Sequence, residues 1–458
     1  MTEAFNIQKS LIVTEHERQN TLNRIIEGFA DAIDAQGGFD DKSKTAMKCK
    51  KDGTKSGIMA MMERWFLIQE LYGANKDDCL VPSDPVKDHW LRRELMEGGF
   101  SEEKADELDT QLVSIAKSEY GLYRERTDQI NTEELLQVNL RTLVDNMLFT
   151  YNIGNGIRLD DTIKFSKDSY QKLLTQYEKN TPIATPQDRE LFLSRLLLLF
   201  LRYNTVSGDV RGYQMALPES VFAYLQTIYH LQHECFASPM NACPIINSFC
   251  SRFPDTDVYF GSQGSFFDYS IEEGVFEANP PFVEECMIRN IRRINELLRH
   301  ADENQKPLTF FIIVPRWNEA DCESYNLTVF GTPERPESGE KSPYFVLELS
   351  LDKDTHYYRN GMAYRDDFSV MKARNNSLML VLQSSKAREV MPINQDSFRK
   401  EVHANWDLEA PEYSVEIKMP IPGRRRYERG NGDVWTRRSG KRSYGGYDRS
   451  SGRRFKQT

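Results

Sequence analysis

The stretch "GVFEANPPFVEECMIRN" at 274–290 decides how the second half of this chain folds. A short apolar run at 274–278 predicts a strand, and helical periodicity begins directly after two consecutive prolines. A helix is predicted over 281–300, with Val283, Met287, Ile291, Ile294 and Leu298 on one face. The residues Asn-Pro-Pro-Phe at 279–282 therefore stand where a strand ends and before a helix begins.

The sequence around this stretch alternates between strand and helix patterns. Further strands are predicted at 233–237, 257–261, 308–315, 344–350 and 377–384. Strand, helix, strand is typical of an open α/β sheet, and two late strands without a long helix between them predict an antiparallel edge. We therefore predict an α/β domain over 233–422.

The first half of the chain predicts a helical domain over 1–232. Apolar residues recur at helical spacing in 13–33, 57–72, 131–149, 185–203 and 217–232. Thr185 is a suitable N-cap, and Pro186 suits the first helical position. Strand patterns are rare in this half, so we expect few or no strands there.

The last residues, 423–458, have a composition typical of disorder. They are rich in Arg, Gly, Ser and Tyr and show no periodicity. From Arg424 onward, twelve Lys or Arg against three acids give +9, which leaves −19 for the rest of a chain of net charge −10. Arginines interleaved with aromatic residues suit contact with single-stranded RNA, and the alternatives are a nuclear-import signal or a solubilising tail.

Composition excludes several classes of protein. The chain has 458 residues and no run of eighteen apolar residues, so we expect no membrane span. Its N-terminus lacks the pattern of a secretory signal. Seven scattered cysteines favour a reducing compartment, and none of them has zinc-knuckle spacing, so we expect no metal.

The Asn-Pro-Pro-Phe turn suits binding of an amino group on a planar base. Ligands of open α/β sheets bind at the carboxyl ends of the strands. Pro280 and Pro281 stiffen the turn, so that the Asn279 side-chain oxygen and the Pro280 carbonyl are held side by side, next to the flat ring of Phe282. Two acceptors can take both N–H donors of an exocyclic amine, whose nitrogen then becomes a better nucleophile. The other interpretation is a plain turn before a helix.

The pattern resembles motif IV of amino-methyltransferases that use S-adenosylmethionine, and its surroundings resemble one family of them. In order, these are "LLLLFLRYNTVSG" (196–208), "QMALPESVFAYL" (214–225), "HECFASPMNACP" (233–244), "FPDTDVYFGSQGSFFD" (253–268) and "GVFEANPPFVEE" (274–285). Together they are similar to the catalytic core of the phosphorylated-CTD-interacting-factor family. The resemblance covers roughly 190–385 well and the first half more loosely.

This resemblance implies a fold, an activity and partners. It implies a Rossmann-like S-adenosylmethionine-dependent methyltransferase domain that methylates the 6-amino group of the adenosine, itself 2′-O-methylated, next to a 7-methylguanosine cap. The implied catalytic residues are Asn279, Pro280, Pro281 and Phe282. The implied partner is capped mRNA, and the implied location is the nucleus, with the cytoplasm left open.

The resemblance also implies which residues bind the cofactor. The turn after 233–237 would meet its methionine part, and the glycine-bearing loop at 261–268 would approach the cofactor or the substrate. The implied contacts are Glu234, Ala237, Ser238, Pro239, Gly261, Ser262, Gly264, Ser265, Asp268 and Asn279. Glu234 can accept from an ammonium group, or alternatively it simply caps or pairs with a nearby base.

The chain departs from the family pattern in two respects, and two other functions stay open. Members of the family from animals carry a WW domain with two tryptophans about twenty residues apart, and no two tryptophans fit here, which puts binding to the RNA polymerase tail in doubt. Ala237, Ser238 and Pro239 also stand where glycines are common. The alternatives are an adenine methyltransferase acting on DNA or internal RNA, and a non-catalytic RNA-binding relative.

Overall fold

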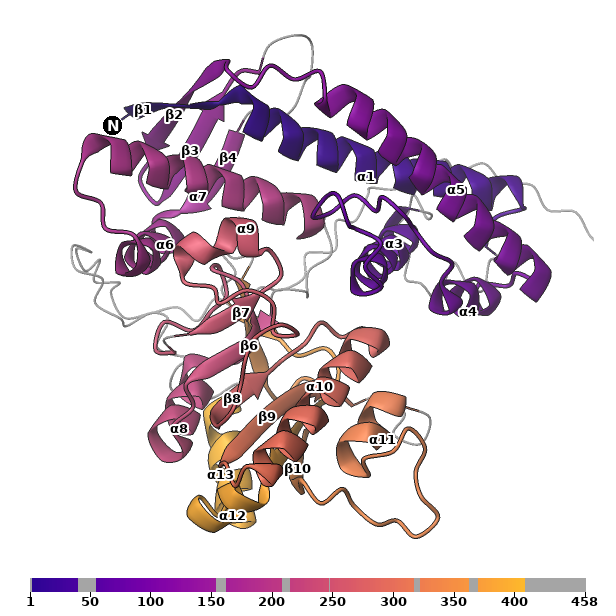
Figure 1. Cartoon of the computed structure of the whole chain (residues 1–458), viewed down its shortest axis with the longest axis vertical. Helices are drawn as coiled ribbons and strands as arrows, with labels where there is room; N and C mark the ends of the chain where they lie inside the picture. Colours follow the sequence, from indigo (N-terminus) through magenta and orange to yellow (C-terminus); the bar gives the residue numbers. More distant parts are fainter. Residues whose placement is uncertain are drawn as a thin grey trace, which may run out of the picture. The chain divides into compact units, whose positions relative to one another are not determined.

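In the computed structural model the chain divides into two units, Met1–Ser414 and Val415–Thr458. The structure describes residues 2–39, 55–153, 162–207, 215–246, 248–316, 322–361 and 370–407 (Figure 1). The second unit and the predicted disordered tail at 423–458 lie outside these residues. The domain boundaries predicted at 232 and 422 stay predictions.

The first half of the chain contains a four-stranded antiparallel sheet beside its helices. The sheet has the order β1-β2-β3-β4, with β1 at Thr2–Gln8, β2 at Leu135–Thr142, β3 at Asn146–Tyr151 and β4 at Thr162–Ser166. The helix predicted over 131–149 is therefore wrong, and this half is not purely helical. Val138 and Leu140 are buried while Gln137 is exposed. This two-residue period fits a strand with one face on the core, and it prevails over the helical spacing of the same residues.

Six helices accompany this sheet within the described residues. They are α1 (Lys9–Ala35), α3 (Lys55–Leu71), α4 (His89–Glu97), α5 (Glu102–Thr127), α6 (Lys167–Asn180) and α7 (Pro186–Ser207). The helices predicted over 13–33, 57–72 and 185–203 are confirmed. Thr185 caps α7 as predicted: its Oγ1 accepts from Asp188 N at 3.2 Å, and Asp188 Oδ2 accepts from Thr185 N at 2.8 Å.

One hydrophobic core joins these helices to the inner face of the sheet. Helix α1 packs along α5 and also contacts α7 (Figure 1). Phe29 of α1, Leu112 of α5, Phe149 of β3, Phe165 of β4 and Phe200 of α7 are all fully buried in this core. Burying aromatic and leucine side chains of this size is the main force that holds the first half together.

The second half is built on a six-stranded mixed sheet. Its order is β10-β13-β9-β8-β6-β7, with β6 at His233–Ala237, β7 at Phe249–Ser251, β8 at Gly274–Ala278, β9 at Leu308–Pro315, β10 at Phe345–Leu351 and β13 at Ser377–Gln383. Strands β7, β6, β8 and β9 are parallel, whereas β13 is antiparallel to both β9 and β10. The predicted α/β class and the predicted antiparallel edge are confirmed.

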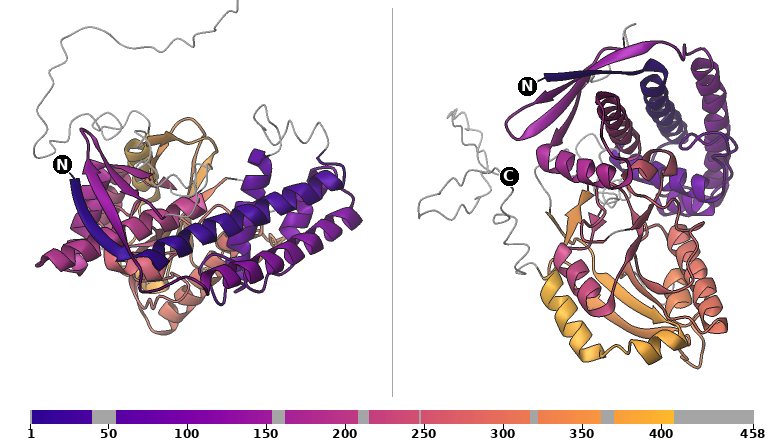
Figure 2. Two further views of the ribbon diagram at one scale, coloured as in Figure 1. Left: turned by 90° about the horizontal axis from the view of Figure 1, so that it is seen from above. Right: turned by 60° about the vertical axis from the view of Figure 1, so that its left-hand side comes forward.

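Helices cover both faces of this sheet (Figure 2). Helix α10 (Glu284–Glu303) buries Ile291, Ile294 and Leu298 on one face, close to α11 (Glu323–Val329). On the other face lie α8 (Glu219–Tyr229) and α13 (Gln395–Trp406), with α12 (Ser385–Val390) beside β13 and β9. The helices predicted at 217–232 and 281–300 are thus confirmed, with shifted ends.

One strand predicted in the second half is wrong, and a short strand next to β6 was not predicted. Residues 257–261 belong to two helical turns, α9 (Pro254–Asp257) and η1 (Val258–Phe260), rather than to a strand. Pro254 at the first helical turn and two acids after it are start signals that outweigh the local β propensity. The strand that follows β6 in the chain is instead β7. It is three residues long, which is too short to show a two-residue period in the sequence.

A third, three-stranded sheet lies beside the end of β8. Its order is β12-β11-β5, with β12 at Val370–Lys372, β11 at Tyr357–Asn360 and β5 at Met215–Ala216. Its antiparallel pairs include Asn360 with Met215. This sheet positions the main chain of Met215, which contacts the Asn-Pro-Pro-Phe turn.

Candidate active site at the carboxyl ends of the strands

The candidate site lies where the central parallel strands end. Strands β6, β7 and β8 are neighbours and parallel, so their carboxyl ends, at Ala237, Ser251 and Ala278, meet at one edge of the sheet. Asn279 follows β8 directly. This is the edge at which open α/β sheets bind their ligands.

The Asn279 side chain is held in one orientation by the main chain. Its Nδ2 donates to the carbonyl of Met215 at 3.0 Å. Because a carbonyl requires a donor, this contact turns Oδ1 away from Met215 and leaves it as an acceptor for a ligand. Asn279 is half-buried, and the preceding strand residue, Ala278, is fully buried.

The remaining residues of the turn form a short, stiff connection to α10. Val283 N donates to the Pro281 carbonyl at 2.7 Å, so that carbonyl is already used within the fold. The Pro280 carbonyl is the backbone acceptor next to Asn279 in the chain. Val283 is buried in a small cluster with Leu67 and Ile68 of α3. The 279–282 turn is therefore fixed at one end by Met215 and at the other by packing against α3.

Phe282 forms part of the wall of a cavity of about 320 Å³, which we call the aromatic cavity. The cavity lies between the motif and helices from the first half. Its lining comes from α3 (Met61, Arg64, Trp65, Ile68), from α4 and its N-cap (Asp88, Trp90, Leu91, Glu94), and from the motif and the start of α10 (Phe282, Val283, Glu284, Glu285). The indole Nε1 atoms of Trp65 and Trp90 are buried without a hydrogen-bond partner. Aromatic walls with unused donors fit a planar, polar ligand.

Carboxylates crowd the aromatic cavity. Burial, together with repulsion from Asp88 and Glu284, raises the pKa of Glu285 to about 7. Burial also raises the pKa of Asp88 and of Glu94, although Glu94 forms an ion pair with Arg64. Because several acids share one positive charge from Arg64, the cavity favours a cationic ligand.

Three ionisable residues at the rim of this cavity lie close enough to hold a cation. Ligand atoms of Asp88, His89 and Glu285 all lie within 4.8 Å of one another. His89 is exposed, and its Nε2 lies 3.7 Å from Glu285 Oε1. The sequence expectation of no metal considered cysteine spacing alone and did not consider this group.

Glu234 lies beneath the loop that follows β6. It is buried, and its Oε1 accepts from Cys243 N at 2.7 Å. Burial raises its pKa to about 7, although the main-chain N–H of Cys243 and the positive charge of Lys172 act in the opposite direction. Glu234 thus has a main-chain donor and a basic neighbour, as the alternative interpretation predicted.

Ala237, Ser238 and Pro239 form the turn at the end of β6. Ser238 N donates to Asn241 Oδ1 at 2.6 Å, and Asn241 N donates to Ser238 Oγ at 3.3 Å. This reciprocal pair closes the turn where a glycine-rich loop would use positive φ angles. Ser238 and Pro239 are buried, and Ala237 is half-buried.

The loop that holds Gly261, Ser262 and Gly264 runs beside β7. Gln263 N donates to Phe249 O, and Ser251 N donates to Gly264 O, both at 2.8 Å. This segment therefore extends the sheet beyond β7, two strands away from β8. Gly261 and Gly264 have φ angles of 104° and 90°, which residues with a side chain rarely adopt.

The predicted cofactor residues of this loop differ in their surroundings. Ser262 is buried, and its Oγ lies 2.6 Å from Ser251 Oγ, so this hydroxyl is used within the fold. A Cβ at Gly264 would meet no atom within 4 Å, so the main chain there is open to an approaching group. Ser265 Oγ accepts from Phe267 N at 3.2 Å, and Asp268 is exposed. The roles of all these residues stay predictions.

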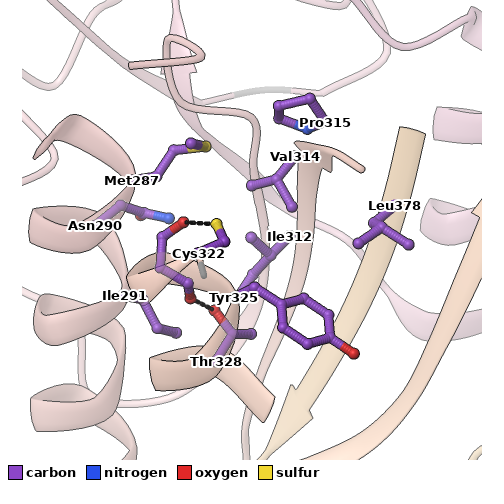
Figure 3. A pocket seen from close by; sticks show the side chains of 11 residues that line it. Met287, Asn290, Ile291, Ile312, Val314, Pro315, Cys322, Tyr325, Thr328 and Leu378 are labelled. Atoms are coloured by element: carbon purple, nitrogen blue, oxygen red, sulfur yellow. Dashed lines mark hydrogen bonds between the residues drawn. The ribbon is translucent and has the colours of Figure 1, made fainter. Parts of the chain in front are cut away.

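A second cavity, next to β9, is too small for a substrate. It measures about 10 Å³, which is room for about one water molecule. Met287, Asn290, Cys322 and Leu378 are among its lining residues, and Thr328 Oγ1 donates to Ser324 O at 2.7 Å beside it (Figure 3). We interpret it as a packing gap between α10, α11 and β9.

Sequence reasoning missed several residues of this region. Met215 acts through its main chain, which no sequence pattern reveals. Trp65 and Trp90 reach the motif only through tertiary packing. Glu277 could have been predicted, because an acid inside the apolar run "GVFEA" is unusual for a strand that is buried on both faces.

Within the part of the chain that the structure describes, no helix is both long and apolar enough to cross a membrane.

Known proteins resemble this chain over the region that holds the candidate site. Residues 172–361 match the family model described as "Phosphorylated CTD interacting factor 1 WW domain". Two curated relatives, each named mRNA (2′-O-methyladenosine-N(6)-)-methyltransferase, come from Homo sapiens and Mus musculus. Each is 33% identical over 230 residues, which is 49% of this chain and 30% of the relative. The chain therefore spans under a third of the length of these relatives.

These similarities confirm the family resemblance inferred from the sequence. The matched residues contain the 279–282 turn, Glu234 and the 261–268 loop. They contain one tryptophan, Trp317, which lies outside the described residues, whereas a WW module needs two.

Proposed function

We propose that this chain transfers a methyl group from S-adenosylmethionine to the 6-amino group of the adenosine next to a 7-methylguanosine cap. The observation that carries the proposal is the Asn279 contact at the end of β8. A side-chain amide whose Nδ2 is occupied by Met215 O offers its Oδ1 to a ligand donor. The names of the relatives and the family support the same activity.

The sheet supports a Rossmann-like methyltransferase fold. Four parallel strands stand in the order β7-β6-β8-β9, and β13 inserts antiparallel between β9 and β10. The turn that holds Asn279 follows the strand next to β6. We assign the candidate cofactor site to the ends of β6 and β7, where the sequence resemblance puts it.

The 279–282 turn would hold the reacting amine in place. Asn279 Oδ1 and the Pro280 carbonyl accept its two hydrogens, which frees the nitrogen lone pair from the purine ring. Phe282 stacks on the base and limits its rotation. These acceptors are already oriented before the substrate binds, so their effect is preorganised stabilisation rather than general-base catalysis. S-adenosylmethionine, when bound, supplies an electrophilic methyl group.

The residues present fit such a cofactor. Glu277, two positions before Asn279, is buried with its Oε2 unpartnered, and an unpartnered buried acceptor is the group that a bound ammonium satisfies. Gly264 leaves its main chain open beside β7. Glu234, Ala237, Ser238 and Pro239 would meet the methionine part at the end of β6.

The aromatic cavity is our candidate site for the 7-methylguanine base. Methylation at N7 makes that base cationic, and the cavity combines Trp65, Trp90 and Phe282 with four carboxylates. Cationic rings stack well on indoles, and carboxylates accept from the N–H groups of guanine. Because Phe282 belongs both to the cavity wall and to the catalytic turn, a base bound there lies next to the reacting adenosine.

The substrate range tests this proposal. We would compare methyl transfer by the full chain to four oligonucleotides: capped RNA starting with A, the same RNA uncapped, capped RNA starting with G, and single-stranded DNA. The proposal expects a high rate on the first and far lower rates on the rest. Equal rates with and without a cap would favour an internal-RNA or DNA enzyme, and no transfer to any of them would favour a non-catalytic RNA-binding protein.

Location and further partners are also proposals. An mRNA cap methyltransferase meets its substrate first in the nucleus, so we propose a nuclear location. Direct binding to the RNA polymerase tail is not proposed, since the matched residues lack a tryptophan pair of WW spacing. We propose RNA contact by the basic tail at 424–458, from its charge and aromatic content alone.

A further inference from the structure

Two buried carboxyl groups lie opposite each other on neighbouring strands behind the catalytic turn. Glu234 of β6 and Glu277 of β8 are register partners, so both side chains lie on the same face of the sheet, on strands about 4.8 Å apart. They are 2% and 1% exposed. A pair of buried acids at this distance is unfavourable when both are ionised.

The two acids differ in how they are satisfied. Glu234 Oε1 accepts from Cys243 N, whereas Glu277 Oε2 is buried without a hydrogen-bond partner. An unpartnered buried acceptor destabilises a fold, so its presence needs a reason. Glu277 and Val275 are alternate residues of β8 and therefore share a face. Val275 belongs to the hydrophobic cluster against which Met215 packs, so the Glu277 side chain is on the side of the sheet where Met215 lies.

The charges around this pair do not balance when both acids are ionised. Lys172 of α6 is the cation that interacts with Glu234, and its Nζ donates to Met240 O at 2.7 Å. The other ionisable groups that interact with Glu277 or Lys172 are Cys235, Cys243, Tyr358, Glu219 and Arg359. Tyr358 Oη pairs with Ser377 Oγ at 2.7 Å, so this hydroxyl is already used.

We propose that Glu277 and Glu234 together bind the α-ammonium group of the methyl donor, and that this binding displaces a proton that the two carboxyl groups hold in the free protein. The inference rests on the proposed function. The ammonium donates to the unpartnered Glu277 oxygen and to Glu234, and it supplies the second positive charge that Lys172 alone does not. The ammonium adds one positive charge and the proton that leaves Glu277 goes to solvent, so the net charge of the cluster does not change.

The protonation of the free protein agrees with this account. Burial and the charge of Glu234 hold the pKa of Glu277 well above its ordinary value, which favours the neutral carboxyl in the free protein. Burial lowers the pKa of Lys172 to about 8, which keeps most of its charge at that pH. Since the bound ammonium requires an ionised Glu277, affinity should rise with pH over the range in which the free carboxyl is protonated.

Calorimetric binding of S-adenosylhomocysteine to the full chain tests the proposal without any turnover. Titrations at pH 7 in two buffers of different ionisation enthalpy give the number of protons released. We expect about one proton released by the wild type. Glu277→Gln, which mimics the neutral acid, should release about one proton fewer and bind about tenfold or more weakly, because a charge-assisted contact is lost.

Two controls isolate the ammonium contact. 5′-Methylthioadenosine lacks the amino-acid part, so it should bind the wild type and Glu277→Gln equally and release no proton. Glu272→Gln, at an exposed acid just before β8, should behave as the wild type with both ligands. Thermal unfolding should show that Glu277→Gln is folded. If it is not, the wild type alone still tests the idea, because its affinity must rise more steeply from pH 6 to pH 8 for S-adenosylhomocysteine than for 5′-methylthioadenosine.

Each result has a distinct meaning. Binding of S-adenosylhomocysteine with no proton release and with equal affinity in Glu277→Gln would overturn this inference and leave the proposed function standing. No binding of either ligand to the wild type would overturn the proposed function and the inference with it.

Discussion

The orientation of the Asn279 amide leads to a prediction that distinguishes three substitutions. Asn279→Ala removes the Oδ1 acceptor and the 3.0 Å donation to Met215 O together. By comparison with the loss of one preorganised polar contact, we expect the turnover number to fall about 10²- to 10³-fold, or about 3–4 kcal/mol. The free energy of unfolding should change less, by about 0.5–1.5 kcal/mol for one half-buried hydrogen bond.

Asn279→Asp should also lose activity, although aspartate offers the same acceptor. An ionised carboxylate would put an oxygen where Nδ2 now donates to the Met215 carbonyl, and two acceptors in contact repel each other. Only the protonated acid can donate to Met215 O. The proximity of that carbonyl raises the pKa of the aspartic acid, so the activity of this variant relative to wild type should increase as pH falls from 8 to 6.

The assay is single-turnover methyl transfer to a short capped RNA starting with A, with binding and unfolding measured on the same samples. Asn405→Ala is the matched control, because Asn405 is also half-buried and its Nδ2 also donates to a main-chain carbonyl, that of Glu401 at 2.8 Å. It should keep wild-type turnover. Full activity of Asn279→Asp at pH 8 would refute the reasoning that Met215 orients this side chain.

Other predictions concern the base, the cavity and the tail. Phe282→Ala should lower kcat/KM on capped RNA by an amount that corresponds to about 1–3 kcal/mol of lost stacking, and Phe282→Tyr should keep most of the wild-type kcat/KM. Glu285→Gln should raise the melting temperature above pH 7 and leave it unchanged near pH 4, because an acid whose folded-state pKa is raised to about 7 destabilises the protein once pH rises above its unfolded value. The same variant should bind a 7-methylguanosine nucleotide more weakly at pH 8, and wild-type binding should weaken as pH falls through 7. Deletion of 424–458 should raise KM for long RNA at low salt and leave turnover on a cap dinucleotide unchanged; an unchanged KM would leave the import-signal or solubility interpretation of the tail.

The 279–282 turn was predictable because its sequence signal is local. Two prolines after an apolar run define a stiff turn at the end of a strand, and the helical period after it defines α10. The structure adds the contact that the sequence could not reveal. Met215 belongs to a two-residue strand, and its role is carried by a carbonyl that every residue type possesses.

The aromatic cavity was not predictable, for a related reason. Trp65 and Trp90 lie on helices of the first half, and they meet Phe282 only because α3 packs against the start of α10. Local pattern also misled at two places. The residues of β2 and β3 fit both a helical and a two-residue period, and Val258 to Phe260 favour strand by type but follow a helix-starting proline. Tertiary burial selected strands β2 and β3, whereas the local helix start at Pro254 selected the helical turn at 258–260.

The most direct test of the central claim is to determine which atom receives the methyl group. Capped RNA starting with 2′-O-methyladenosine, and carrying further adenosines inside, would be treated with isotopically labelled S-adenosylmethionine and the full chain, then digested to nucleosides and analysed by mass spectrometry. The account predicts that the label is on N6 of the cap-adjacent adenosine and is absent from internal adenosines. Label on internal adenosines, on a ribose or on the guanine, or no label at all, would contradict it.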